Sequence, residues 1–455
     1  MAKKLLGWFL LGGMVLFLAV MAAGSVIKIN CSGRIAPGVQ LFGEDLSGMS
    51  LAEAKAAVAG SAPEVRLELV CSILPEMRAE AEEKIRQAGY DTGEEISIKI
   101  IGNEWRLTAK VPMITMLTEE TMERLAACSE EVTMWEWLYA AVFKRPFSIR
   151  QAEAEFVWEE SCFSELLSIC AELLGREKRE AAVEWNNGTI LVRESRTGFR
   201  IDTGKATEEA NAVFAQVLEK IRRAPAKGLV VRISLDGTAM MPGLSTAKAQ
   251  KCNTKIAEFT TWYQGAGSGR AQNIAAGAAH LNQCVILPQE EFSTAEALMP
   301  FTEGNGYTAG GTYVNGTLSE SIGGGVCQLS TTLYNALLRT RLTITERYAH
   351  SMPVGYIPPG QDAAIAGDYK DLKFKNTTDA PVLLLCEATG EEVRVTLYGS
   401  AEALRPNVKM ESVIVEENEN GMTVEVYRLE QAEGEAPLRE LVSLNKYHYM
   451  KKENR

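Results

Sequence analysis

The sequence contains few histidines and no cysteines at metal-ligand spacing. Histidine occurs only at positions 280, 350 and 448, which leaves few candidates for imidazole chemistry. The nine cysteines form no C-x-x-C pair, and none combines with a histidine at the spacing typical of a zinc site. We therefore expect neither a metal centre nor a bound cofactor.

Positive charge is also scarce. The 47 Lys and Arg residues are outnumbered by 59 Asp and Glu residues, giving a net charge of −12. This balance argues against a nucleic-acid-binding protein, which would be expected to present a basic face. With 46% hydrophobic and 23% charged residues the chain is not generally disordered, and its 455 residues indicate two to four domains.

Long apolar runs are absent except for one at the N-terminus, residues 5–27, which contains no charge. A helix of this length spans the roughly 30 Å of a bilayer. Lys3 and Lys4 precede it and should remain cytoplasmic, so we expect a single-pass cell-membrane protein whose bulk is extracytoplasmic. The alternative is a cleaved signal peptide, for which residues 22–24 supply the small side chains.

After this cytoplasmic start and anchor, residues 1–30, the predicted fold is a multi-domain α+β arrangement. A helix at 51–58 begins after Ser50, with Glu53 placed for a capping box, and hairpin patterns occur at 96–108 and 181–192. A helix at 118–127 follows the first hairpin and another at 207–223 follows the second. We interpret these as two small α+β units, residues 31–140 and 141–240.

Residues 241–400 are rich in glycine and aromatic side chains, and we expect a mixed α/β domain there. Alternating apolar residues from position 381 onward indicate antiparallel strands, and 401–455 is expected to be a β-rich C-terminal extension.

The stretch GGGVCQLSTTLY, residues 323–334, places a cysteine at the start of a predicted helix directly after three glycines. Glycine allows positive φ and close backbone approach, and a helix N-terminus lowers a thiol pKa. Leu329, Leu333 and Leu337 form the predicted buried stripe, which leaves Cys327 on a more polar side.

Two kinds of site follow from this pattern. In the first, Cys327 is a nucleophile, His350 its base and Asp362 the residue that orients the imidazole, as acyl transfer requires. In the second, the glycine loop and helix form a ligand pocket, and Cys327 is only a small packed side chain. The predicted ligand-binding residues are Gly323, Gly324, Gly325, Gln328, Ser330, Thr331, Tyr334, Arg347 and Asp362. Glu320 is a weaker catalytic candidate, as the single acid of a lysozyme-like lytic enzyme.

The motif GGGVCQLSTTLYNALL, together with ERYAHSMPVGYIPPGQDAAI at 346–365 and DLKFKN at 371–376, resembles the VanW family of cell-envelope proteins. RAQNI at 270–274 and PQEEFS at 288–293 extend the resemblance over about residues 250–380. The preceding units resemble, less closely, a peptidoglycan-binding domain that often stands before a VanW domain. Cys284 and Gln289 depart from the family pattern, which usually has glycine at these positions.

The family is associated with glycopeptide-resistance clusters, so the resemblance implies a membrane-anchored protein that binds peptidoglycan or a wall precursor. The alternative is a wall-modifying enzyme that uses Cys327 and His350, or less readily Glu320. The sequence favours the binding interpretation, because nothing outside this motif demands covalent chemistry.

Overall fold

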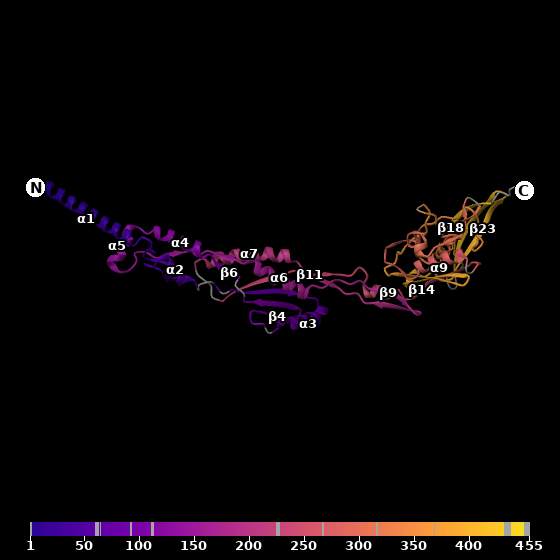
Figure 1. Ribbon diagram of the computed structural model, residues 1–455, viewed down its shortest axis with the longest axis horizontal. Helices are drawn as coiled ribbons and strands as arrows, with labels where there is room; N and C mark the ends of the chain where they lie inside the picture. The colour runs from indigo at the N-terminus through magenta and orange to yellow at the C-terminus, as the bar shows by residue number, and fades with distance from the viewer. Residues whose placement is uncertain are drawn as a thin grey trace. The chain divides into compact units, whose positions relative to one another are not determined.

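The computed structural model describes residues 2–449 apart from 60–62, 64, 92, 111–112, 224–227, 266–267, 315–316, 368 and 432–437, and for 2–12 and 312–320 the backbone only. The chain is a mixed α+β protein that divides into two compact units (Figure 1). Unit 1 comprises residues 1–177 and 198–240, and unit 2 comprises residues 178–197 and 241–455.

Unit 1 contains the N-terminal helix and a sheet covered by two longer helices. Its elements are α1 (Ala2–Asn30), β1 (Val39–Leu41), β2 (Glu44–Asp45), α2 (Leu51–Val58), β3 (Val65–Ser72), α3 (Arg78–Ala88), β4 (Ile96–Ile101), β5 (Glu104–Ala109), β6 (Ile114–Met116), α4 (Thr118–Glu130), α5 (Met134–Phe143), β7 (Arg150–Ala152), β8 (Phe156–Trp158), α6 (Glu160–Leu174), β11 (Gly198–Ile201), α7 (Thr203–Ile221), β12 (Leu229–Leu235) and β13 (Gly237–Met240).

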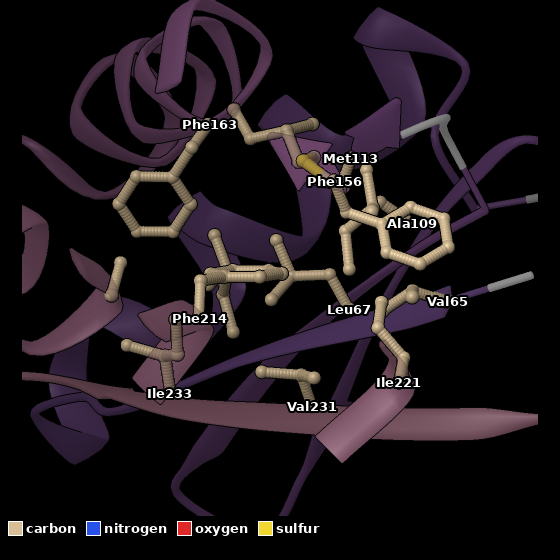
Figure 2. Packing of buried hydrophobic residues seen from close by; sticks show 14 of the residues in the cluster. Val65, Leu67, Ala109, Met113, Phe156, Phe163, Phe214, Ile221, Val231 and Ile233 are labelled. Carbon is tan, nitrogen blue, oxygen red and sulfur yellow. The ribbon is translucent and has the colours of Figure 1, made fainter. Parts of the chain in front are cut away.

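The core of unit 1 forms on a four-stranded sheet of order β12-β3-β5-β4. Alternate residues of β3 and β12, including Leu67 and Ile233, are fully buried, as expected for strands with one covered face. Figure 2 shows Phe214 of α7 among these strand side chains. Its ring stacks on Trp158, with the ring centroids 4.6 Å apart, and joins helix, sheet and β8 in one cluster.

The structure divides this half of the chain differently from the expected units 31–140 and 141–240. β12 pairs in parallel with β3, with Leu229 opposite Val65, so a strand of the second expected unit completes the sheet of the first. The hairpin near residue 185 belongs to unit 2 instead. Hairpin and helix patterns are local, and they contain no information on which distant strand becomes a neighbour.

Helix α1 is long and apolar enough to span a membrane. Its described part, Gly13–Asn30, has a mean hydropathy of 1.8, and 6% of it is buried in the protein. The apolar side chains of this segment are therefore mostly exposed within the protein, and a helix of this length and composition is able to span a bilayer.

Unit 2 contains the glycine-rich region and the C-terminal strands. Its elements are β9 (Ala182–Asn186), β10 (Thr189–Arg193), α8 (Thr246–Gln250), β14 (Thr254–Trp262), α9 (Gly269–Leu281), β15 (Cys284–Ile286), β16 (Glu291–Ser293), α10 (Thr294–Leu298), β17 (Ala309–Val314), β18 (Thr317–Ile322), α11 (Cys327–Leu337), β19 (Thr343–Glu346), β20 (Lys373–Lys375), β21 (Val382–Thr389), β22 (Glu392–Gly399), β23 (Val408–Asn418), β24 (Gly421–Glu430) and β25 (Leu438–His448).

Two helices pack on the antiparallel sheet β14-β22-β21-β15 of unit 2, α9 against β21 and α11 against β14 and β22. A separate antiparallel sheet of order β23-β24-β25 follows, as the alternating pattern predicts. From Gln328 to Leu337 every side chain of α11 is buried, so α11 is the central helix of the unit.

Several local predictions are confirmed. Ser50 and Glu53 form the capping box of α2, and both expected hairpins are present as β4–β5 and β9–β10. The helix expected from residue 207 begins earlier, at Thr203, because the side chain of Asp202 accepts a hydrogen bond from the Lys205 N–H and caps it there.

Replacement of Phe214 by alanine should destabilise unit 1. Its ring is fully buried, so Phe214→Ala removes a large apolar contact and leaves a cavity, which we expect to lower the free energy of unfolding by about 3–5 kcal/mol. The measurement is limited proteolysis of the full chain with mapping of the first cleavages, which should move into unit 1. Val230→Ala, at a 49% exposed position of β12, should change the stability by less than about 0.5 kcal/mol and serves as the control.

Candidate functional site

Helix α11 begins at Cys327, as the sequence predicts, and the three preceding glycines are each needed for its entry. Gly323 has φ 82° and Gly325 has φ 111°, a region that other residues rarely adopt. A Cβ on Gly324 would lie 2.3 Å from the carbonyl oxygen of Gly310 in β17. The glycine loop therefore passes directly over β17 before it places the cysteine at the helix start.

Part of the glycine loop is already hydrogen-bonded within the protein. The N–H of Gly323 donates to the Thr308 carbonyl at 3.3 Å, and that of Gly324 donates to the Ser321 carbonyl at 3.1 Å. Among the described residues the backbone N–H groups of Gly325 and Cys327 have no acceptor, and no side chain caps α11. The anion-binding capacity predicted for the whole loop thus lies in these two N–H groups.

The structure brings Cys327, His350 and Asp362 together. The Nδ1 of His350 lies 2.6 Å from Oδ2 of Asp362, and the backbone N–H of His350 donates to the same oxygen at 2.7 Å. The ring of His350 and the sulfur of Cys327 shift each other's pKa, so the two groups are neighbours. The sulfur also accepts a hydrogen bond from the Ile365 N–H at 3.4 Å and lies 3.4 Å from the Ile365 carbonyl oxygen. Cys327 is partly exposed and the His350 side chain is 21% exposed, whereas that of Asp362 is 1% exposed.

The charges of these three groups support one another. Removal of water from the sulfur raises the pKa of Cys327, but the hydrogen bond and charge of His350 outweigh it, so the net pKa is lowered. Burial lowers the pKa of His350, but hydrogen bonds with Asp362 and Cys327 raise it to about 9. Burial raises the pKa of Asp362, whereas its hydrogen bonds with His350 and Tyr447 lower it to about 2. The shifts of Cys327 and His350 both favour the charged pair of thiolate and imidazolium over the neutral pair, and Asp362 is a carboxylate at neutral pH.

Arg347 and Tyr447 hold the turn that carries Asp362. The guanidinium of Arg347 donates to the carbonyl oxygens of Asp362 at 2.8 Å and Gly360 at 2.9 Å. The hydroxyl of Tyr447 donates to Oδ1 of Asp362 and accepts the Gly360 N–H at 2.7 Å. Tyr447 lies in β25, so the C-terminal strands form part of the site.

Most of the polar side chains predicted to line a ligand pocket are buried and bonded within the protein. Gln328 donates to the Thr261 hydroxyl and the Trp262 carbonyl, and both Ser330 and Thr331 donate to the Ala363 carbonyl. Tyr334 is 3% exposed and lies under the guanidinium of Arg347. These residues position α11 against residues 361–363, and the helix is polar on this side because it packs on backbone.

Arg270 and Tyr356 interact electrostatically with Cys327 and were not among the predicted site residues. Arg270 donates to Gln328 at 2.8 Å, its guanidinium carbon is 5.9 Å from the Tyr356 ring centroid, and its charge lowers the pKa of Cys327. The charge of Cys327 in turn raises the pKa of Tyr356, after the larger effect of burial. Arg270 lies in the motif at 270–274 and Tyr356 in the motif at 346–365. Both motifs belong to the family resemblance, and this could have identified the two residues.

Glu320 lies in β18, but its side chain is outside the described residues. No group of three or more His, Cys, Asp or Glu residues with metal-binding geometry occurs in the described part of the chain.

Replacement of Asp362 by asparagine should raise the pKa of the Cys327 thiol. Without the carboxylate the pKa of His350 falls, and a neutral imidazole stabilises the thiolate less. Each unit of increase in the thiol pKa moves the midpoint of thiol ionisation upward by one pH unit. The measurement is the pH profile of Cys327 alkylation in the full chain, followed by peptide mapping, with the midpoint expected to move upward in Asp362→Asn.

Asp379→Asn is the matched control, since this half-exposed aspartate pairs with Lys251 at the surface. Its alkylation profile should equal that of the wild type. An unchanged profile in Asp362→Asn as well would contradict the coupling of the three groups.

Comparison with known proteins shows that the region around the candidate site is similar to a protein family. Residues 269–398 match the family model described as VanW like protein. The chain is 35% identical over 146 residues, 32% of its length, to the uncharacterized protein YoaR of Bacillus subtilis (strain 168), covering 48% of that protein. It is 36% identical over 112 residues, 24% of its length, to the vancomycin B-type resistance protein VanW of Enterococcus faecalis (strain ATCC 700802 / V583), covering 41% of that protein.

The chain thus spans about half the length of the curated relatives it matches, and no solved structure matches it. The matched residues contain α9, the glycine loop, Cys327, His350 and Asp362, but neither unit 1 nor the sheet β23-β24-β25. Residues 269–398 therefore form a VanW-like domain.

Proposed function

We propose that the protein is a membrane-anchored, thiol-dependent enzyme that cleaves or transfers amide bonds of cell-wall peptides. The observation that carries this proposal is the arrangement of Cys327, His350 and Asp362, in which each group stabilises the charged form of the next. A nucleophile, a base and an orienting carboxylate are the components of covalent acyl transfer.

The reaction follows from the positions of these groups. The thiolate of Cys327 attacks the carbonyl carbon of a peptide bond, and the backbone N–H groups of Gly325 and Cys327 stabilise the oxyanion that forms. The imidazolium of His350 gives its proton to the leaving amine, and a thioester remains on Cys327. Water or an acceptor amine then attacks the thioester and yields its proton to His350, which restores the thiolate and imidazolium.

The location of the site favours the cell wall as substrate. With Lys3 and Lys4 on the cytoplasmic side, α1 would place both units outside the membrane, where the peptide-linked polymer is peptidoglycan. One relative carries vancomycin resistance in its name, which is in keeping with a role at the cell envelope. In this proposal unit 1 supplies contact with the wall or its precursors, and no nucleic acid is involved.

A protein that only binds peptidoglycan is the alternative interpretation of the same motif. A pocket built on Gln328, Ser330 and Thr331 would need their polar groups to face a ligand, but all three are buried and bonded to the protein. A purely structural cysteine would also not need a buried aspartate to charge the histidine beside it. We therefore propose that any binding of the protein to peptidoglycan is the binding of an enzyme to its substrate.

Loss of the thiol should abolish the reaction without loss of the fold. We expect Cys327→Ser to eliminate release or exchange of wall peptides, and His350→Ala to reduce the rate by about 10²–10⁴-fold. The measurement incubates the full-length protein in detergent with purified peptidoglycan, with and without an added amine acceptor. Mass spectrometry of soluble fragments and of the Cys327 peptide after acid quenching then detects products and the thioester.

Cys284→Ser is the control, because this cysteine is also partly exposed but hydrogen-bonds to the His280 carbonyl in α9. It should retain full activity. If the wild type changes no amide bond under either condition, or if Cys327→Ser remains as active as Cys284→Ser, the enzymatic proposal is wrong.

A further inference from the structure

Helix α5 and the segment after it leave an unusual number of large apolar side chains in contact with solvent. The exposed fractions are 46% for Trp135, 62% for Val142, 58% for Phe143, 67% for Phe147 and 61% for Ile149. Scattered exposed apolar residues are common, but a contiguous cluster of this kind marks a surface that contacts another apolar phase.

The same surface packs directly against the apolar helix α1 (Figure 1). The rings of Trp135 and Phe17 lie 6.2 Å apart between centroids, and the Ser25 hydroxyl lies 2.8 Å from the sulfur of Met134. Lys28, near the end of α1, donates to a carbonyl in the turn before α5. The exposed cluster is therefore continuous with the surface of α1 over the half nearest its C-terminal end.

The charges around the cluster match a lipid headgroup region. Between positions 132 and 149 the only acidic residue is Glu136, whose carboxylate binds the Arg150 guanidinium and the Ser148 hydroxyl. Lys144 ends α5, and the guanidinium of Arg145 lies 6.0 Å from the Tyr139 ring centroid. Aromatic side chains followed by exposed Lys and Arg are typical of segments at the membrane–water interface.

A groove of about 550 Å³ opens between these side chains, lined mainly by Trp135, Leu138, Tyr139, Val142, Phe143 and Phe147. Its walls are largely apolar, so a flexible hydrocarbon chain fits its chemistry better than a polar peptide does.

We infer that α5 and residues 144–149 form a second membrane contact, lying in the outer leaflet beside α1. The apolar side chains enter the acyl region, while Lys144 and Arg145 reach the lipid phosphates. This inference rests on the membrane span of α1, but not on the chemistry of Cys327. A second copy of the chain is a less fitting occupant, because α1 and its surrounding lipid already border the cluster.

The contact holds unit 1 against the bilayer at two points. A single helix ending at Asn30 would permit free rotation of the unit about the chain, whereas α5 limits this freedom. The enzyme would then be attached through a unit of fixed orientation at the membrane surface.

The test uses the full-length protein reconstituted in liposomes whose phospholipids are brominated in the acyl chains, which quench nearby tryptophans. Seven tryptophans contribute, including Trp8 in the span. Trp135→Phe removes a tryptophan that we place in lipid, so the quenched fraction of the total fluorescence should fall relative to wild type. Trp262→Phe removes a 65% exposed tryptophan of unit 2 and should raise that fraction.

Flotation of the liposomes distinguishes a failure of anchoring by α1 from a failure of the second contact by α5. Protein that does not float with the vesicles overturns the anchoring by α1 and this inference with it, while the peptidoglycan assay still decides the enzymatic proposal. If the protein floats but the quenched fraction of Trp135→Phe is higher than that of the wild type, as expected for Trp262→Phe, the second contact alone is overturned. Circular dichroism of Trp135→Phe should match the wild type, since nearly half of this side chain is exposed.

Discussion

The buried carboxylate of Asp362 is the charge on which the site depends. Its side chain is 1% exposed, and a carboxylate without water needs other hydrogen-bond donors to remain ionised. It obtains them from the ring and backbone of His350, from Tyr447 and from Arg347. These donors come from two stretches of the chain, the segment after β19 and strand β25, and Asp362 lies in a third, so one anion fixes the three relative to one another.

Helix α11, which begins at Cys327, is fixed by a different kind of interaction. From Gln328 to Leu337 α11 is buried on all sides, and its polar face is hydrogen-bonded to the backbone of Ala363. Ala363 directly follows Asp362 in the sequence. The glycine loop approaches β17 so closely that a Cβ at Gly324 would overlap a carbonyl oxygen. The thiol and its partners are therefore positioned by rigid packing, which suits a site where small displacements reduce reactivity.

The two units divide the proposed tasks. Unit 2 contains Cys327, His350 and Asp362, whereas unit 1 contains the apolar helix α1 and the exposed aromatic cluster of α5 beside it. An enzyme acting on a polymer outside the membrane gains from such an attachment, since it is held near its substrate at high local concentration.

Local features of the fold were predictable from the sequence because neighbouring residues decide them. The capping box at Ser50, the hairpin turn at Asn187 and Gly188 and the helix start at Cys327 are all encoded within a few residues. Pairing the thiol with His350 and Asp362 was also possible, because few histidines exist and the surrounding motifs resemble the VanW family. The expected pocket residues were less predictable, since Gln328, Ser330 and Thr331 have the same composition whether they face a ligand or a buried backbone.

The tertiary structure alone decided which distant segments meet. It joined β12 to β3 across more than 150 residues, whereas sequence periodicity placed them in separate units. It also brought Tyr447 to Asp362 and α5 to α1. The sequence by itself determined the apolar N-terminal helix, the local elements and the choice of Cys327, His350 and Asp362 as candidate site residues, because these follow from composition and short-range pattern. The completed site and the exposed aromatic surface depend on long-range packing, which a linear pattern does not contain.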